Sequence, residues 1–402
     1  MPEATCLLRP RDPIIVRDGR PFSADPGARA ETLPWPLPST LAGALRTHIG
    51  NANNFDWNKD GPDKALNIST KGPLLVRFDG RSWNVYLSAP ADAVVFKDDA
   101  GNLNIMRLRP RKSLNNKAGC NIPEGLLPLA IPDEHKPERG YDYWSLEDAV
   151  DWLIGKEDKV PDSYLSGLER EARVHVKIDP SKGTSETGML FATVAICFPD
   201  VPLQQGKRAK FQEVETGSNK LERSTKIKPE LAMLCHVDCG DDTDLSCCDS
   251  GFVPFGGERR VAAIQACAGA WPKFPEKLRN YNFGKRLKLQ LVTPGLFDQG
   301  WKPGWLDDGA DKPECLQGVK LKLVSAAIPR RIPVSGWDLR KNQPKAARYA
   351  VPTGSVYFFE TEEGDIDAEK LWLASISDKP QDRHDGFGLV LPGTWDYAEE
   401  GN

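Results

Sequence analysis

The sequence predicts an α+β protein built from two similar halves. Short segments of alternating apolar residues, typical of strands, recur along all 402 residues, whereas helical spacing is confined to a few short stretches. The order of strand, short helix and strand appears early in the chain and again after residue 250. We therefore divide the chain into residues 1–200, a polar and cysteine-bearing insertion or crossing at 201–250, and residues 251–402.

The composition is that of a soluble globular protein, with 40% hydrophobic and 27% charged residues. No run of about eighteen apolar residues is present, so we expect no membrane span and no membrane partner. The N-terminus lacks a basic leader followed by an apolar core and a cleavage site, which by default predicts a cytoplasmic location. Nine cysteines, an odd number, indicate reduced thiols rather than a disulfide framework.

The first half is predicted to contain strands around one early helix. Residues 5–18 alternate like a strand that is interrupted near Pro13. The stretch PWPLPSTLAGALRTHIG, 34–50, predicts a helix capped by Ser39 or Thr40 and stopped by Gly50, with Gly43 allowing close packing on a sheet. Further strands are expected at 73–80, 82–90 and 92–96, a helix at 144–155, and a hairpin with a turn-rich tip at 172–198.

The second half repeats this pattern with different residues. Strands are expected within 252–266, 286–297, 319–334, 346–360 and 386–395. Helical spacing is found in DAEKLWLASI, 367–376, and the helices are expected to be few and short.

Basic residues are concentrated in two tracts although the net charge is −4. The larger tract, 319–350, has one acid, Asp338, and two aromatic residues, Trp337 and Tyr349. Its basic residues are Lys320, Lys322, Arg330, Arg331, Arg340, Lys341, Lys345 and Arg348. The smaller tract, 104–119, has no acid and contains Arg107, Arg109, Arg111, Lys112 and Lys117. Cations that bind phosphates beside aromatic rings that stack on bases are typical of an RNA or DNA interface. The alternative is that these residues form the solvated faces of ordinary strands.

Two glycine-bearing motifs are candidates for close approach to a ligand. In PFGGERR, 254–260, paired glycines permit a tight turn with exposed amides, and Arg259 and Arg260 are potential phosphate donors. The alternative is an ordinary turn before a strand. DGFGLVLPG, 385–393, resembles half of a dinucleotide fingerprint, but no helix is expected after it and its third glycine comes too late, which argues against a Rossmann role. Gly386 and Gly388 instead predict close approach by another backbone or by RNA.

Cysteines between 235 and 248 are candidates for a zinc site. The four possible ligands are Cys235, Cys239, Cys247 and Cys248, with His236 as a further donor. Their spacing matches no familiar zinc motif, so zinc and an irregular loop of free thiols both remain open. Gly240-Asp241-Asp242 is similar to the metal-binding turn of a polymerase palm, but its polar flanks exclude the required apolar hairpin.

Catalytic motifs are scarce, and we expect no catalytic residue and no cofactor. His175 lies in the alternating segment RVHVKID, where it shares a face with Arg173 and Lys177. It is a candidate general base for RNA cleavage, although a stacking or structural histidine is the more common case on such a strand. His384-Asp385 lacks the further ligands that a metal phosphohydrolase needs, and no P-loop or nucleophile elbow occurs.

In order along the chain, the motifs resemble one known family. RDPIIVRDGRPF and LPWPLPSTLAGALRT are followed by RVHVKIDPSKGTSETGMLF, FGGERR, TPGLFDQGWKP, PKAARYAVPTGSVYFF and GFGLVLPGTW. From about residue 7 to 395 the chain thus resembles the third subunits of Cmr complexes, the type III-B CRISPR RNA-guided effectors, within the RAMP superfamily.

This resemblance implies two ferredoxin-like, RRM-related folds packed together with insertions, one in each half. It implies a non-catalytic subunit of an antiviral ribonucleoprotein. Such a subunit binds the 5′ repeat-derived tag of the crRNA and docks on the large polymerase/cyclase-type subunit and on the first backbone subunit.

By motif, the resemblance assigns Gly256, Gly257, Arg259 and Arg260 to the crRNA backbone, with the Gly386 and Gly388 loop beside them. His175 and Lys182 belong to a projection that would kink or cover the RNA. Arg17, Arg20 and Arg46 are further expected RNA contacts, together with Arg107, Arg109, Arg330, Arg331 and Lys345 of the basic tracts.

Two other functions compete with this one. The chain is alternatively a RAMP endoribonuclease that processes precursor crRNA with His175 as the base. It is otherwise a structural adaptor whose basic tracts meet acidic protein surfaces.

Overall fold

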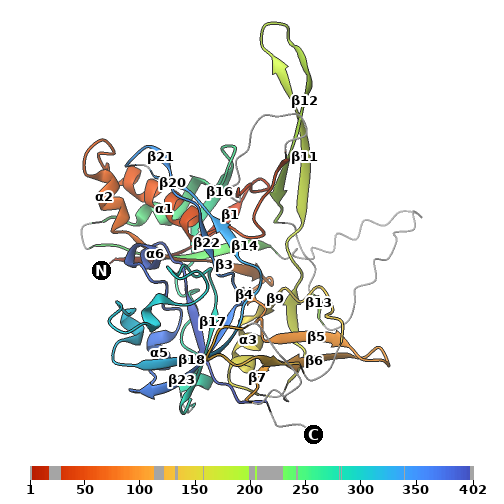
Figure 1. The fold of residues 1–402 in the computed structure, drawn as a ribbon. Helices are drawn as coiled ribbons and strands as arrows, with labels where there is room; N and C mark the ends of the chain where they lie inside the picture. The colour runs from red at the N-terminus through yellow and green to blue at the C-terminus, as the bar shows by residue number, and fades with distance from the viewer. Residues whose placement is uncertain are drawn as a thin grey trace.

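The computed structural model describes residues 2–17, 29–112, 122–131, 135–156, 158–198, 204–205, 230–240, 243–279, 281, 283–338 and 340–398 (Figure 1). The protein is a mixed α and β structure in which strands predominate and the helices are few and mostly short, as predicted. Among these residues, no helix combines the length and the apolar character needed to cross a membrane.

The larger sheet has nine strands in the order β13-β10-β9-β4-β3-β14-β1-β16-β15. All neighbouring strands are antiparallel. The strands are β1 (Glu3–Pro10), β3 (Ser69–Phe78), β4 (Trp83–Ser88), β9 (Tyr143–Ser145), β10 (Ser163–Leu165), β13 (Gln204–Gln205), β14 (Leu231–Asp238), β15 (Ser250–Pro254) and β16 (Val261–Ala266). We call this sheet and the elements packed around it the first half.

Strand β14 lies at the centre of the larger sheet, between β1 and β3. The sequence placed these residues in a polar insertion. Their run LAMLCHVD is nearly continuous in apolar residues, which is typical of a strand buried on both faces. The polar segments on either side of the run concealed it. The larger sheet extends along the chain to Ala266, past the boundary predicted at residue 251.

The smaller sheet forms the second half and has four antiparallel strands in the order β18-β23-β17-β24. They are β17 (Arg286–Leu291), β18 (Lys320–Ala327), β23 (Val356–Glu363) and β24 (Val390–Gly393). If the four strands are numbered by their order along the chain, they lie side by side in the sheet as second, third, first and fourth. The strands β3-β14-β1-β16 of the larger sheet have the same order, with β1 first and β16 last. The repeat seen in the sequence is therefore a repeat of topology.

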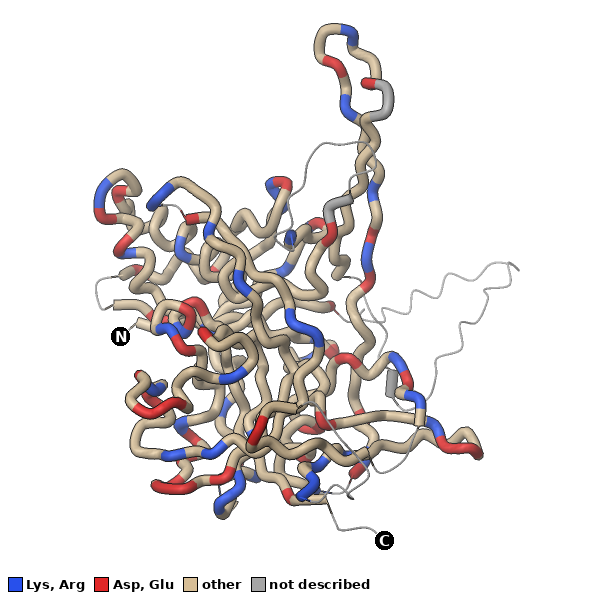
Figure 2. Tube along the Cα trace, viewed as in Figure 1, with Lys and Arg blue, Asp and Glu red and all other residues tan. Residues whose placement is uncertain are grey.

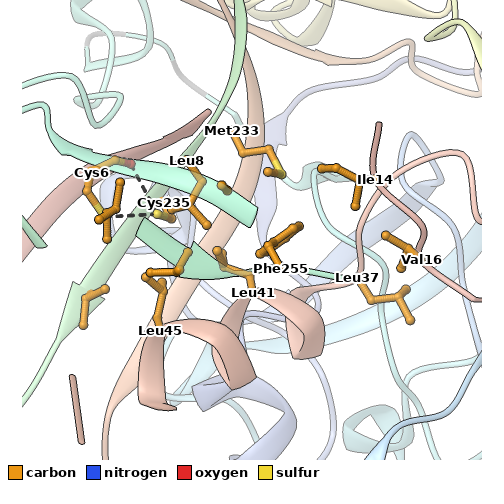
Figure 3. Close-up of a cluster of buried hydrophobic side chains, with 14 of the residues drawn as sticks. Cys6, Leu8, Ile14, Val16, Leu37, Leu41, Leu45, Met233, Cys235 and Phe255 are labelled. Atoms are coloured by element: carbon orange, nitrogen blue, oxygen red, sulfur yellow. Dashed lines mark hydrogen bonds between the residues drawn. The ribbon is translucent and has the colours of Figure 1, made fainter. Parts of the chain in front are cut away.

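Helix α1 (Pro38–Ala52) covers one face of the larger sheet (Figure 3). It begins at Pro38 after Leu37, without a side-chain cap, so the predicted capping by Ser39 or Thr40 is wrong. Gly50 does not end the helix. A Cβ there would lie 2.6 Å from the Trp57 ring, so the absence of a side chain admits that ring. Gly43 faces open space, and the close packing comes from other residues.

The face of the larger sheet opposite α1 packs against the second half. Leu7, Leu74 and Leu234 of this sheet share a cluster with Leu389 and Leu391 from the β24 region. The first half is thus buried on both faces, one by α1 and the other by the smaller sheet.

Several hairpins extend from the two sheets. The longest pairs β11 (Arg170–Asp179) with β12 (Thr184–Ile196) and projects from the body of the molecule (Figure 1). The others are β5 (Ala93–Lys97) with β6 (Leu103–Arg107), β7 (Arg109–Pro110) with β8 (Leu129–Ala130), β19 (Ile332–Val334) with β22 (Arg348–Ala350), and β20 (Trp337–Asp338) with β21 (Gln343–Pro344). Strand β2 (Arg29–Ala30) adds to β12 in parallel.

The remaining helices are α2 (Gly61–Leu66), α3 (Leu146–Leu153), α4 (Glu276–Arg279), α5 (Ala368–Leu371) and α6 (Pro380–His384), with 3₁₀ turns η1 (Ser246–Cys248), η2 (Gly304–Leu306) and η3 (Glu314–Leu316). The predicted helix at 144–155 corresponds to α3. Only Ala368–Leu371 of the predicted 367–376 helix is helical.

Asp92 is a buried acid that joins the two halves. Its carboxylate accepts hydrogen bonds from Lys288 Nζ of β17 (2.9 Å) and from Trp152 Nε1 of α3 (2.8 Å). The Lys288 and Asp92 side chains are 1% and 0% exposed. Burial lowers the pKa of Lys288 to about 8, although the carboxylate of Asp92 opposes that shift.

Replacing one member of the Asp92–Lys288 pair is expected to cost more stability than replacing both. Lys288→Met leaves a buried carboxylate without its cation, which costs about 3–5 kcal/mol. Lys288→Met/Asp92→Asn removes both charges and keeps an acceptor for Trp152, so we expect a clearly smaller loss. Urea unfolding followed by tryptophan fluorescence measures both free energies. Losses from the two single variants that add up in the double variant would contradict the coupling.

The lowered pKa of Lys288 also predicts that this group stabilises the fold more as the pH rises. Between about 8 and the 10.5 of an ordinary lysine, the unfolded chain binds more protons at this position than the folded chain. Stability therefore increases with pH across that window. The Tm of the unmodified protein, relative to that of the uncharged double variant, should increase between the two ends of the window. If the Tm difference between the two proteins decreases with pH instead, the pKa of Lys288 is not lowered in the folded protein.

Candidate nucleic-acid interface

The FGGERR motif forms the turn between β15 and β16, residues 255–260, and docks on the segment 14–17. Gly257 N donates a hydrogen bond to Ile15 O at 2.7 Å. Gly256 has a φ of 80°, and a Cβ there would lie 2.7 Å from Ile15 O. The next two residues, Glu258 and Arg259, also adopt positive φ values, 56° and 54°. Two successive positive φ values are what a type I′ hairpin turn requires, and they are strained for non-glycine residues.

The two arginines of this turn differ in their availability. Arg259 is exposed and makes no ion pair with any residue that the structure describes. Arg260 is largely covered and its guanidinium lies 3.4 Å from Glu258. The Nε of Arg260 is buried without a hydrogen-bond acceptor. Arg259 is therefore the residue of the motif that presents a free cation to solvent.

The segment 14–17 connects this turn to the long hairpin. Ile14 and Ile196 exchange backbone hydrogen bonds at 2.8 and 2.7 Å, which fixes the base of β12 beside the segment. Arg173 and, to a smaller degree, Arg260 lower the pKa of Glu171, so the base of β11 lies in the field of the turn. Arg17 ends the segment and is bridged to Thr32. Arg20 lies outside the described residues.

His175 is on the long hairpin, as predicted, on the same face as Arg173. Its Nε2 lies 2.8 Å from Thr193 Oγ1, and its ring stacks on Phe191 with centroids 5.0 Å apart. Neither partner is an acid or a base, so these contacts hold the ring in place without activating it for proton transfer. Lys182, at the tip, lies 3.5 Å from Asp179.

Residues 328–351 form an extension from the second half that we call the arm. It contains β19, β20, β21 and β22, and β20 and β21 lie near α1 (Figure 1). Arg340 pairs with Asp63 of α2 at 3.0 Å, so the arm reaches the first half. Arg348 forms a bidentate ion pair with Asp382 of α6, with N–O distances of 2.8 and 2.7 Å.

The arm presents cations and aromatic rings to solvent. The side chains of Arg330, Arg331, Lys341 and Lys345 are exposed. Arg331 stacks over the ring of Tyr349 at 3.9 Å, and the exposed fractions of Tyr349 and Trp337 are both 53%. Figure 2 shows basic residues along the arm with few acidic ones beside them. Exposed rings beside cations can stack on bases while phosphates are neutralised.

The turn, the segment 14–17, the long hairpin and the arm all rest on one hydrophobic cluster. Phe255 of the turn and Ile14 of the segment are both buried there (Figure 3). The cluster also contains Ile196 from the hairpin base and Val334 and Ala350 from the arm. Ile14 and Ala350, 336 positions apart in the sequence, thus pack in the same core. We give the name basic surface to five exposed basic residues of the turn and the arm that make no ion pair with a described residue: Arg259, Arg330, Arg331, Lys341 and Lys345.

Two of the expected RNA-contacting arginines are buried in structural roles. Arg46 donates to Ile68 O at 3.0 and 2.8 Å and pairs with Asp385 at 2.5 Å. Arg107 is stacked on Trp152 at 3.5 Å and pairs with Asp158 at 2.8 Å. These arginines are committed to the fold, which corrects the expectation that they contact RNA.

The remaining predicted positions lie away from the basic surface or inside the fold. Arg109 is partly exposed and lies 3.7 Å from Asp158. Gly386 is buried, and a Cβ there would lie 2.7 Å from Thr70 O. At Gly388, a Cβ would lie 2.5 Å from Ser377 Oγ. Of the two possibilities that the sequence left open for this loop, close approach by another backbone is the one that the structure contains.

The zinc candidates belong mainly to the core. The Sγ atoms of Cys235 and Cys6 are 3.3 Å apart (Figure 3). Nothing in the sequence indicated that these two cysteines are neighbours. Burial raises the pKa values of Cys239 and Cys247 to about 12, which keeps both thiols protonated. Cys248 is buried too. In the described part of the chain, no group of three or more histidine, cysteine or acidic residues is arranged to hold a metal ion. Asp241 and Asp242 lie outside that part.

Comparison with known proteins gives one family and several related structures. The model of the CRISPR-associated protein family Cas_Cmr3 matches residues 6–395. Two structures of the type III-B Cmr-β complex bound to cognate target RNA, one also with AMPPnP, contain a similar chain. Each is 14% identical over 88% of this chain and 86% of that chain, with TM-scores of 0.44 for the AMPPnP state and 0.42.

The Csm3–Csm4 subcomplex of the type III-A CRISPR-Cas interference complex contains another similar chain. It is 10% identical over 98% of this chain and 99% of that chain, with a TM-score of 0.35. Among curated proteins, no match was found.

The turn at Gly256 is expected to tolerate no side chain. Gly256→Ala meets both the positive φ and the contact with Ile15 O, so we expect a loss of about 2–3 kcal/mol. Gly269→Ala is the matched control, since Gly269 has a similar φ of 75° but no atom within 4 Å of an added Cβ. Its loss should be near 1 kcal/mol. Equal losses in denaturant unfolding would mean that the docking on Ile15 adds nothing.

Proposed function

Because the chain belongs to the family of CRISPR-associated Cas_Cmr3 proteins, we propose that it is a non-catalytic subunit of a type III-B CRISPR effector complex that binds crRNA on its basic surface. The observation that carries this proposal is the common core under the turn, the segment 14–17, the hairpin and the arm. Four motifs that the sequence marks as basic or glycine-bearing meet on one side of α1's sheet. A single RNA strand can contact such a surface along its length.

The charge of the basic surface supports RNA as the ligand. Arg259, Arg330 and Arg331 carry charges that the protein leaves exposed, whereas Arg46 and Arg107 are neutralised inside it. The planar guanidinium group suits phosphate, and the exposed rings of Trp337 and Tyr349 suit unpaired bases. The 5′ repeat-derived tag of the crRNA, a single-stranded segment, is the part of the guide that we assign to this surface.

The topology supports a ferredoxin-like origin for both halves. Each contains four antiparallel strands in which the first strand lies between the third and the fourth. In the first half, α1 connects the first and second of these strands, as in a split βαβ unit. In the second connection, between β14 and β16, the described residues (239–240 and 243–260) contain η1 and β15 and no α-helix. We propose that the first half is a ferredoxin-like fold in which a strand has replaced the second helix.

The partners follow from the family and remain part of this proposal. We assign docking contacts to the large polymerase/cyclase-type subunit and to the first backbone subunit. The His175 surroundings give the endoribonuclease alternative no support, because its ring partners are Thr193 and Phe191. The adaptor alternative differs from the proposed function in the ligand of the basic surface, which would bind an acidic protein surface instead of RNA.

Removing two cations of the basic surface is expected to weaken binding of a single-stranded RNA with the tag sequence. Arg259→Ala/Arg331→Ala should lower the affinity about tenfold at moderate salt, and the slope of log K against log salt should fall by about 1.4. The control Arg279→Ala/Lys370→Ala removes the same charge from α4 and α5. Fluorescence anisotropy at several salt concentrations measures both. Equal effects of the two variants would contradict the proposed surface.

A further inference from the structure

A cavity of about 760 Å³ is lined by the β3–β4 hairpin and by no residue of the basic surface. It is bounded by β4, by α3 and by the segment 270–277 that leads into α4. Its apolar and aromatic lining includes Trp83, Val85, Leu146, Val150 and Pro275. This size and this lining are typical of a site for a small organic group.

Arg77, on β3, lines the cavity and is unusual because it is a buried cation without a hydrogen-bond partner in the described part of the chain. Its side chain is 1% exposed, and none of its three nitrogen atoms has a hydrogen-bond acceptor in the described part of the chain. A guanidinium group carries five N–H donors and stays protonated in proteins. Burying it without an anion costs several kcal/mol, and a buried group without partners calls for an explanation such as a bound ligand.

None of the neighbouring polar groups accepts a hydrogen bond from Arg77 in the described part of the chain. Asp79 accepts hydrogen bonds from Arg81 N, Ser82 N and Asn84 Nδ2 at 2.8–3.0 Å. The Tyr86 hydroxyl is bonded to Ser163 at 2.8 Å. Burial lowers the pKa of Arg77, and its interactions with Tyr86 and Asp79 only partly oppose this.

The charges around the cavity select the kind of anion. The lining contains three cations, Arg77, Lys273 and Lys277, and three acids, Asp79, Glu147 and Glu276. Lys277 is paired with Glu147 at 3.3 Å and with Asp151 at 2.9 Å. The lining thus has no net positive charge with which to attract a phosphate dianion or an RNA strand. A single carboxylate satisfies Arg77 and brings in only one negative charge.

We propose that this cavity is a binding site for one carboxylate carried on an apolar or aromatic body, with Arg77 as its anchor. The carboxylate accepts paired hydrogen bonds from the guanidinium group. The body fills the space beside Trp83, Leu146 and Pro275. The source is a free aromatic carboxylic acid or an acidic side chain of a partner subunit, and both present the same chemistry.

Phenylacetate is the probe that tests this site on the full chain. Titration calorimetry or saturation-transfer NMR should show that phenylacetate binds at least tenfold more tightly than its neutral isostere phenylacetamide and more tightly than phenyl phosphate. Arg77→Met should weaken phenylacetate binding at least tenfold. Arg81→Met, which removes an exposed arginine from the same hairpin, should bind like the unmodified protein.

The Tm of the free protein separates a binding role from a structural one. If Arg77 is held for a ligand, Arg77→Met leaves the Tm of the free protein unchanged or raises it. A fall in Tm well beyond that of Arg81→Met would overturn the proposal, as would phenylacetate binding that is equal in Arg77→Met or no tighter than that of phenylacetamide.

The assembled effector complex identifies the source of the carboxylate. Loss of phenylacetate binding on assembly supports the site with a partner subunit's acidic side chain as its occupant. Unchanged binding supports the site with a free carboxylic acid as its ligand.

Discussion

The buried ion pair between Arg46 and Asp385 holds the two halves together, alongside the Asp92–Lys288 pair and the hydrophobic cluster that both sheets share. Arg46 projects from α1, and Asp385 begins the glycine-bearing loop that precedes β24. The next residue, Gly386, packs on Thr70 of β3, and its carbonyl accepts a hydrogen bond of 2.7 Å from Thr293. Because both charged side chains are less than a tenth exposed, separating them would leave an unpaired buried charge. The halves are therefore fixed relative to each other at this point.

The basic surface takes its rigidity from the same region. Arg348 anchors the returning strand of the arm to Asp382, on the helix that leads into Asp385. The arm is thus tied to α6, and through Asp385 to α1, so its cations are presented over the first half from a fixed base. The turn at 255–260 is held by Ile15 in the same way. A surface positioned by packed elements orients a flexible single strand at a lower entropic cost than mobile loops would.

The sequence predicted the repeated halves, the long hairpin and the exposed cations because these features have local signals. Alternation at 172–198 predicts the β11–β12 hairpin, and the composition of the tract at 319–350 predicts cations beside aromatic rings. It did not identify β14, since the run LAMLCHVD lies in a polar context. It also could not separate Arg46 from Arg259. Whether an arginine is buried against an acid such as Asp385 depends on chain positions about 340 residues apart. Arg77 carries no sequence signal, because its missing acceptor is a property of the folded cavity.

Crosslinking in the assembled complex tests directly whether the basic surface holds the 5′ tag of the crRNA. The complex would be assembled on crRNA photolabelled within the tag, and the crosslinked peptides of this chain would be identified by mass spectrometry. We expect crosslinks in the turn 255–260 and in the arm 328–351. Crosslinks confined to other subunits, with none on this chain, would contradict this assignment and leave the chain as a protein adaptor.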